Sequence, residues 1–369
     1  MDRKHSGYCA ASNPTLIGTG GLEALARPTF LRRSGMIVPM AALSTDTTHK
    51  TLTIPTVDLA SADAAQQIRA AYSTYGFAYV VNHGVPPQQV AELFETSRRF
   101  HASDQSQKLE IALDTSHRGF IPIDTSTARH STLAKVTKPN QSQSFMMMRE
   151  DAAGSEQVRA GSYLAGSNKW PDWQPEFRPV VEGYNDQMVG LGMRLVGLIE
   201  DALGCRPGGL SECFQPPTTW LRLLHYPVRP ADAPDDLYGS APHCDFGFLT
   251  LLAQDNVGGL QVMSPEGDWL DVPPMPGAFV MNVGDMLHQW SNGILRSTPH
   301  RVINVSGVER YSCPFFFDPH VSTVIAPLAS CVEAEGARFE PVNFGEFLRG
   351  RLEGSYDQHA SVAADVKVD

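Results

Sequence analysis

The chain has 369 residues, of which 42% are hydrophobic and 19% charged, and its formal net charge is −11 at pH 7. This composition is that of a globular protein with a sizeable core, and the negative charge argues against a surface for nucleic acid or anionic membranes. No apolar run approaches the roughly 20 residues that span a bilayer, and the six cysteines include no C-x-x-C pair. We therefore expect a cytoplasmic protein with neither nucleic-acid nor membrane partners; the sequence makes no prediction about its oligomeric state.

Both ends of the chain differ from its body. Residues 1–50 are rich in Ser, Thr, Gly and Pro and lack sustained helical or strand periodicity, so we expect a disordered extension. Met36 and Met40 are alternative starts within it, and its arginines with few acids faintly resemble an organelle transit peptide. Residues 354–369 are expected to form a polar tail.

Residues 51–215 predict helices joined by short strands. The apolar residues of the longest predicted helix recur at helical spacing up to Gly204, a residue type that commonly ends helices. Gly76 likewise stands directly after a predicted helix and is expected to end it. Pro86 stands in the first turn of the next predicted helix, where the missing N–H of proline costs nothing. The predicted strands span Ile54–Leu59 and Phe77–Asn82, and the predicted helices span Ala64–Tyr75, Pro86–His101 and Asp186–Leu203.

Residues 216–353 change to short β-rich runs separated by Gly, Pro and Asn. Strands of this length at even spacing, after a helical first half, predict an antiparallel sandwich or jelly roll flanked by helices. The predicted fold class is α+β and mainly β, with the helical region packed on a jelly-roll core. The expected strands are Thr219–Tyr226, Phe248–Leu252, Gly259–Met263, Ala278–Val283, Val302–Val305 and Tyr311–Phe317.

His243 and Asp245 are candidate metal ligands, because residues two apart on a strand project from the same face. The pair alone is weak evidence, since a hydrogen-bonded surface pair has the same spacing. His300, at the start of another predicted strand, strengthens the case. Two imidazoles and one carboxylate leave positions open on the metal, as in non-haem iron(II) oxygenases, although zinc with a bound water accepts the same donors. The spacing does not separate the two metals.

Longer stretches surround these residues: His243–Leu252, Gly258–Val262, Asn282–Asp285, Trp290–Gly293, Ser297–Val302 and Arg310–Ser312. In content and order they resemble the 2-oxoglutarate/iron(II)-dependent dioxygenases of the isopenicillin-N-synthase-like group. Ile54–Leu59 and Gly76–Val85 resemble the opening of that group as well, so the resemblance covers about residues 52 to 350. The motifs taken together are highly specific.

The resemblance implies a double-stranded β-helix, or jelly roll, with iron inside its mouth and helices outside. It implies Fe(II) held by His243, Asp245 and His300, with 2-oxoglutarate as cosubstrate and O2 as oxidant. The implied reaction couples oxidative decarboxylation of 2-oxoglutarate, to succinate and CO2, with hydroxylation, desaturation or cyclisation of a small organic substrate. The identity of that substrate is not predicted. In such folds the pocket is shaped by variable segments, here Arg118–Met148, Pro230–Ala241 and Phe317–Val321.

Arg310 and Ser312 are the candidates for binding 2-oxoglutarate, because they share one strand face and offer a planar cation and a hydroxyl to a carboxylate. Tyr226, at the end of a predicted strand, resembles a family tyrosine that contacts the cosubstrate. The family frequently has asparagine just before this tyrosine, where this chain has Leu224 and His225. His225 is either a donor to the pocket or a core histidine.

Two other interpretations stay open. An iron-dependent oxidase like isopenicillin N synthase, which does not consume 2-oxoglutarate, also carries Arg-x-Ser. A catalytically silent binding protein on a jelly roll is the second alternative, although the intact metal ligands argue against it. For the substrate, the side chains of Phe120, Phe145 and Phe317 suggest an apolar small molecule.

Overall fold

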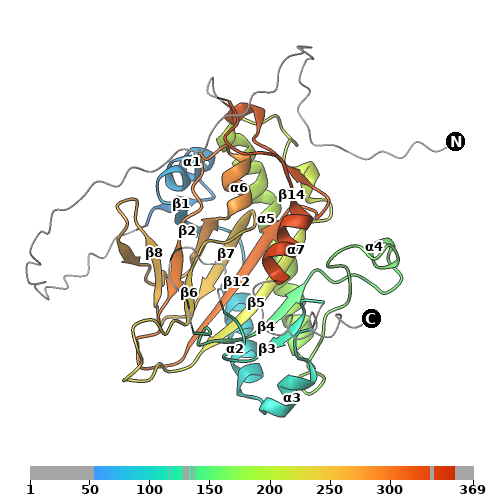
Figure 1. The fold of residues 1–369 in the computed structure, drawn as a ribbon, viewed down its shortest axis with the longest axis vertical. Coiled ribbons are helices and arrows are strands. Elements are labelled where there is room, and N and C mark those ends of the chain that lie inside the picture. The colour runs from blue at the N-terminus through green and yellow to red at the C-terminus, as the bar shows by residue number, and fades with distance from the viewer. Residues whose placement is uncertain are drawn as a thin grey trace, which may run out of the picture.

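The computed structural model describes residues 54–353, apart from 115, 128–132, 134–135, 137 and 333–335. The expected disordered extension over 1–50 and the polar tail over 354–369 lie outside the described residues. Within these ranges the chain forms two main β-sheets flanked by helices (Figure 1). None of the helices there is long and apolar enough to cross a membrane.

Among the described residues, eight strands make the larger sheet, in the order β1-β2-β10-β7-β12-β5-β4-β3. β1 and β2 are parallel, and the other neighbours are antiparallel. Strands from both sides of residue 216 share this sheet, and the predicted division there stays a prediction. The strands are β1 Thr56–Asp58, β2 Phe77–Val81, β3 Gly119–Ile121, β4 Gln143–Met148, β5 Thr218–Tyr226, β7 Leu249–Gln254, β10 Phe279–Val283 and β12 Arg310–Asp318.

A smaller sheet closes the jelly roll. Its described strands run in the order β6-β11-β8-β9, with bounds Ser240–His243, His300–Val302, Leu260–Met263 and Trp269–Asp271. Side chains of both sheets meet in one apolar cluster, to which the larger sheet contributes Phe77 and Tyr226 and the smaller one Leu260 and Val302. This cluster marks the interior of the jelly roll, the fold that the sequence predicted. A separate short pair is formed by β13 Val324–Ile325 and β14 Val342–Asn343.

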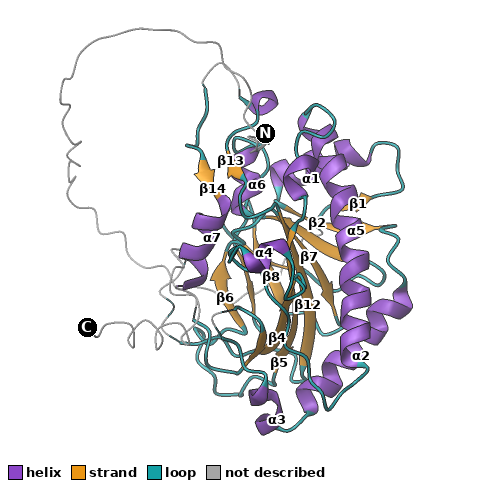
Figure 2. Cartoon of the chain, turned by 90° about the vertical axis from the view of Figure 1, so that its right-hand side faces the viewer, coloured by secondary structure: helices purple, strands orange, loops and turns teal. Residues whose placement is uncertain are grey.

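Helices cover the other face of the larger sheet, where α1, α2 and α5 run along the strands (Figure 2). The longest, α5, was expected from Asp186 but begins at Phe177, because Val181 and Tyr184 extend its buried row. It ends at Gly204 in the left-handed region, as predicted. The helices are α1 Ala64–Thr74, α2 Pro87–Ala102, α3 Gln105–Glu110, α4 Glu156–Arg159, α5 Phe177–Leu203, α6 Asp285–Trp290 and α7 Phe344–Glu353.

One predicted strand is misplaced. β11 spans His300–Val302, whereas we expected Val302–Val305. Beyond Val302 the chain turns, because the Asn304 side chain donates to the carbonyl oxygens of Pro227 and Val308. Val305 is 74% exposed, so its β-branched side chain gave a misleading strand signal.

The three phenylalanines expected near the substrate lie instead in the layer between the larger sheet and the helices. The ring of Phe145 is 5.5 Å from that of Phe100 on α2 and 4.7 Å from that of Phe177 on α5. Phe120 contacts Phe100 as well, at 6.0 Å, and Phe317 lies in the same core cluster. These rings therefore give no support to an apolar substrate, because they project from the outer face of their strands.

The tight approach of α5 to the sheet predicts a position-specific stability effect. A Cβ built on Gly192 would lie 2.7 Å from the ring of the fully buried Phe317. We expect Gly192→Ala to lower the free energy of unfolding by about 1–3 kcal/mol, because the buried ring has no room to move. The measurement is urea unfolding of the two proteins.

Gly190→Ala is the matched control. Gly190 is exposed on the same helix, and a Cβ there would meet nothing within 4 Å. We expect this substitution to raise the free energy of unfolding by about 0.5–1 kcal/mol through the helix preference of alanine. Equal effects at the two positions would contradict the close packing of α5 on β12.

A buried carboxyl group joins three segments of the jelly roll. Asp318, which ends β12, accepts hydrogen bonds from the Phe248 N–H at 2.6 Å and from Trp220 Nε1 at 2.8 Å. Burial raises the pKa of Asp318 from 3.8 to about 7, although both hydrogen bonds lower it. Since the folded pKa is the higher one, the stability that this proton contributes is present below about pH 4 and is lost as the pH rises through about 7.

Asp318→Asn removes this titration. We expect the free energy of unfolding of the variant, relative to that of the wild type, to rise by on the order of 2–3 kcal/mol between about pH 5 and pH 8. Any cost of the amide that does not depend on pH leaves this change unaffected. Denaturant unfolding at the two pH values measures the change. A stability difference that does not vary with pH would contradict a raised pKa at Asp318.

Candidate active site

The structure brings His243, Asp245 and His300 together at one place. His243 ends β6, Asp245 lies in the turn before β7, and His300 begins β11 directly opposite His243 in the antiparallel register. Their potential ligand atoms all lie within 4.8 Å of one another. Asp245 Oδ1 is 3.6 Å from His243 Nε2 and 3.7 Å from His300 Nε2. Three donor atoms therefore converge on one point.

Backbone carbonyl groups orient both imidazoles. His243 Nδ1 lies 2.8 Å from the carbonyl oxygen of Ala241, and His300 Nδ1 lies 3.3 Å from that of Thr298. Because a carbonyl oxygen only accepts, each Nδ1 carries the proton and donates it. Each Nε2 is then left with its lone pair directed toward Asp245, which is the tautomer that a metal ligand requires.

The two oxygens of Asp245 have different surroundings. Oδ2 accepts hydrogen bonds from Thr250 Oγ1 at 2.6 Å and from Asn282 Nδ2 at 2.7 Å, while Oδ1 faces the imidazoles. Thr250 and Asn282 are paired across β7 and β10, so the sheet register delivers both donors. Sequence reasoning did not assign these two roles, although both residues lie within the stretches that carry the family resemblance.

Protonation at this cluster suits metal binding. Burial, together with the neighbouring His243, lowers the pKa of His300 to about 4. Burial raises the pKa of Asp245, but the two imidazoles and the two hydrogen bonds outweigh it and hold that pKa below its usual value. At neutral pH His300 is thus neutral and Asp245 ionised. Two imidazole nitrogens and a carboxylate oxygen form a donor set that fits Fe(II) with positions left open.

Arg310, Ser312 and Tyr226 also lie together. The Arg310 side chain is 0% exposed, donates from Nη1 to Ser312 Oγ at 3.2 Å, and lies 4.7 Å from the ring centroid of Tyr226. A third contact, from Nη2 to Gln254 Oε1 at 3.1 Å, was not foreseen from the sequence. Arg310 Nε is buried without a partner, and no carboxylate of the described residues pairs with the guanidinium. A buried cation with donor capacity to spare fits a carboxylate ligand such as that of 2-oxoglutarate.

His225 lies on the opposite face of β5 from Tyr226. It stacks on Tyr311 at 4.7 Å between centroids, and its Nδ1 is 2.8 Å from Gln143 Nε2. Neighbouring His101 of α2 lies in the same layer. Of the two roles considered for His225, the structure therefore supports the core histidine and not the pocket donor.

A small, open hollow lies where two of the segments expected to shape the pocket meet. Met148 comes from the first of these segments, and His320 and Val321 come from the third. Tyr163 and Leu164 complete its wall from the loop that follows α4. Met148, at the end of β4, is thus a boundary between the jelly roll and this hollow.

Comparison with known proteins identifies the family. The model of the 2OG-Fe(II) oxygenase superfamily matches residues 217–319, and the model of the non-haem dioxygenase in morphine synthesis N-terminal matches residues 54–173. The 2-oxoglutarate-Fe(II) type oxidoreductase hxnY of Emericella nidulans is 32% identical over 305 residues, which cover 80% of this chain and 86% of that protein.

Solved structures agree in fold and in cosubstrate. A full-length protein of Neurospora crassa in complex with alpha-KG matches with a TM-score of 0.72 and 27% identity, over 83% of this chain and 97% of that one. JOX2 in complex with 2OG, Fe and JA matches with a TM-score of 0.69 and 28% identity, over 84% and 89%. These similarities do not favour an oxidase that ignores 2-oxoglutarate or a silent binding protein. The chain belongs to the 2OG-Fe(II) oxygenase superfamily, and it is a 2-oxoglutarate- and Fe(II)-dependent dioxygenase.

Proposed function

We propose that His243, Asp245 and His300 hold the catalytic Fe(II), and that Arg310, Ser312 and Tyr226 bind the far carboxylate of 2-oxoglutarate. The observation that carries the proposal is the convergence of two imidazole Nε2 atoms and one carboxylate oxygen inside the jelly roll. When bound, the iron and 2-oxoglutarate supply the oxidation, in which O2 and the keto acid give succinate and CO2 while a C–H bond of the substrate is hydroxylated, or the substrate is desaturated or cyclised.

The protein's own groups supply order and charge. Thr250 and Asn282 keep Asp245 oriented, so the ligands need little rearrangement when the metal binds. Arg310 offers its positive charge from a fully buried position, where a charge-assisted hydrogen bond is stronger than in water. The surrounding apolar cluster, which includes Phe77 and Leu260, limits the access of water to the reacting groups.

The substrate in this proposal is a small organic molecule and not a nucleic acid. The Neurospora crassa protein has been solved with thymine and with 5-formyluracil, and JOX2 with JA, which supports a small-molecule substrate here. We also propose a cytoplasmic location. The free thiols of Cys205, Cys244, Cys313 and Cys331 support a reducing compartment.

Removal of one ligand tests the metal assignment. We expect His243→Ala to weaken Fe(II) binding by more than about 100-fold and to abolish succinate formation, because losing a ligand costs more than the 10- to 100-fold typical of a supporting residue. Thr250→Val, which removes a hydrogen bond to Asp245, should fall within that smaller range. Anaerobic equilibrium dialysis with Fe(II) measures both. His83→Ala, at a histidine bonded to the Gly277 carbonyl, is the control and should bind iron normally.

Substitution of Arg310 tests the cosubstrate assignment. We expect Arg310→Gln to raise the KM for 2-oxoglutarate by about 10- to 100-fold, since a charge-assisted hydrogen bond contributes about 1.5–3 kcal/mol. Arg310→Lys should be intermediate, because lysine keeps the charge but loses the planar fork. Arg98→Gln is the control, since Arg98 lies over the Tyr311 ring, on the outer face of the same strand. An unchanged KM in Arg310→Gln would place the cosubstrate elsewhere.

A further inference from the structure

A second arginine inside the jelly roll has no role in the chemistry described above. Arg222 lies in the middle of β5, two residues before Leu224 and four before Tyr226. Leu224 and Tyr226 belong to the apolar cluster between the two sheets. Because alternate residues of a strand face the same side, Arg222 also faces the interior.

The guanidinium of Arg222 is only partly satisfied. Its Nη2 donates to Ser144 Oγ of β4 at 2.8 Å, and its Nε is buried without a hydrogen-bond partner. Within the part of the chain that the structure describes, no carboxylate pairs with it. A partly desolvated cation whose nearest partner is a neutral hydroxyl favours an anion from outside the chain.

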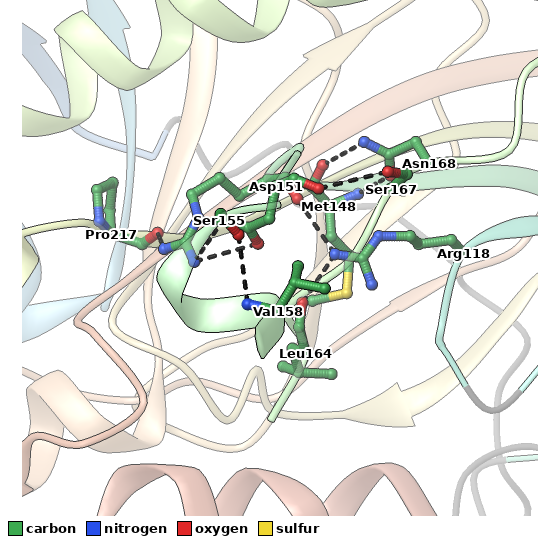
Figure 3. Close-up of polar contacts among 10 residues, drawn as sticks. Arg118, Met148, Asp151, Ser155, Val158, Leu164, Ser167, Asn168 and Pro217 are labelled. Atoms are coloured by element: carbon green, nitrogen blue, oxygen red, sulfur yellow. Dashed lines mark hydrogen bonds and ion pairs between the residues drawn. The ribbon is translucent and has the colours of Figure 1, made fainter. Parts of the chain in front are cut away.

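Arg118 shows the contrasting case of a buried arginine whose two terminal nitrogens both donate to the chain itself, although its Nε, like that of Arg222, has no partner. Its Nη1 donates to the Ser116 carbonyl oxygen at 2.8 Å, and its Nη2 donates to that of Arg149 at 3.1 Å. Nη2 also donates to the carbonyl oxygen of Leu164 at 2.7 Å (Figure 3). These contacts tie the loop around α4 to the sheet. Arg118 therefore has a structural role, whereas the Arg222 side chain has no carbonyl acceptor among its contacts.

The register places Arg222 between the two ends of the proposed site. On one side, Leu224 pairs with Ser312 of the cosubstrate group. On the other side, Trp220 pairs with Phe316, which pairs in turn with Thr250, the residue that supports Asp245. Leu224 and Trp220, which begin these two rows of paired residues, are each two residues from Arg222 along β5, or about 7 Å. An anion on Arg222 would therefore lie in the interior between the row that contains Ser312 and the row that contains Thr250.

Charge balance points to the substrate as the source of that anion. The positive charges of Fe(II) and Arg310 equal the negative charges of Asp245 and the 2-oxoglutarate dianion, so the proposed site is neutral without Arg222. Asp318, another buried carboxyl group, is engaged by Trp220 and the Phe248 N–H. A substrate with one negative charge would match the charge of Arg222.

We propose that Arg222 binds a carboxylate of the substrate, so that the enzyme oxidises a small organic acid. This inference rests on the proposed function of the same site. Met146 pairs with Arg222 across β4 and β5, and Met148 pairs with Trp220, so the arginine is flanked by apolar side chains. The acid then carries an apolar body, which these methionines and Trp220 contact while Arg222 fixes its charged end.

Matched acids and amides test the charge preference. The full chain, loaded with Fe(II) and saturating 2-oxoglutarate without O2, is titrated calorimetrically with phenylacetate, cinnamate and octanoate and with their three primary amides. We expect at least one acid to bind tenfold or more tightly than its amide, and Arg222→Gln to remove that preference. Arg222→Lys should keep part of it. Arg178→Gln, at an exposed arginine paired with Glu182, should keep all of it.

Three results would overturn the proposal. The first is that no acid binds more tightly than its amide, and the second is that the preference survives in Arg222→Gln. The third is that Arg222→Gln weakens binding of 2-oxoglutarate tenfold or more, which would assign Arg222 to the cosubstrate. Wild-type protein that neither binds 2-oxoglutarate nor forms succinate would overturn the function of the site itself, and this proposal with it.

Discussion

The alternation of side chains along each strand of the larger sheet is the constraint on which both the core and the site depend. One face of β5 and β12 packs against α2 and α5, and the other encloses the interior. A single strand can therefore hold Phe317 in a tight apolar layer and Arg310 in a polar pocket. The apolar core between the helices and the sheet stabilises the fold. The interior of the jelly roll can therefore hold polar groups.

The polar groups of the interior are few and each is positioned by the backbone or by a neighbouring strand. Carbonyl oxygens set the tautomers of His243 and His300, and β7 and β10 supply the donors for Asp245. Such fixed partners lower the reorganisation needed when a metal and its cosubstrate bind. Arg310 is held from both sides by uncharged partners, which leaves its charge available to a ligand.

Local spacing was enough to predict the residues whose roles depend on two positions of one strand. Arg310 and Ser312 are such a pair on β12. Asp245 lies in the turn after β6, so for His243 and Asp245 the resemblance of their surroundings carried the prediction, and not the expected shared strand. Roles that depend on register were not predicted: Gln254 meets Arg310 only because β7 and β12 align, and Arg222 gains its place from the pairing of β5 with both neighbours. The misplaced strand after His300 has in part the same origin, since one of the two Asn304 contacts that turn the chain is to Pro227, which is distant in sequence.

The most direct test is a crystal structure of the full chain with Fe(II) and 2-oxoglutarate, prepared without O2. We expect iron bonded to Nε2 of His243, Nε2 of His300 and a carboxylate oxygen of Asp245, with the far carboxylate of 2-oxoglutarate on Arg310 and Ser312. Iron bound by other side chains, or 2-oxoglutarate bound away from Arg310, would contradict it.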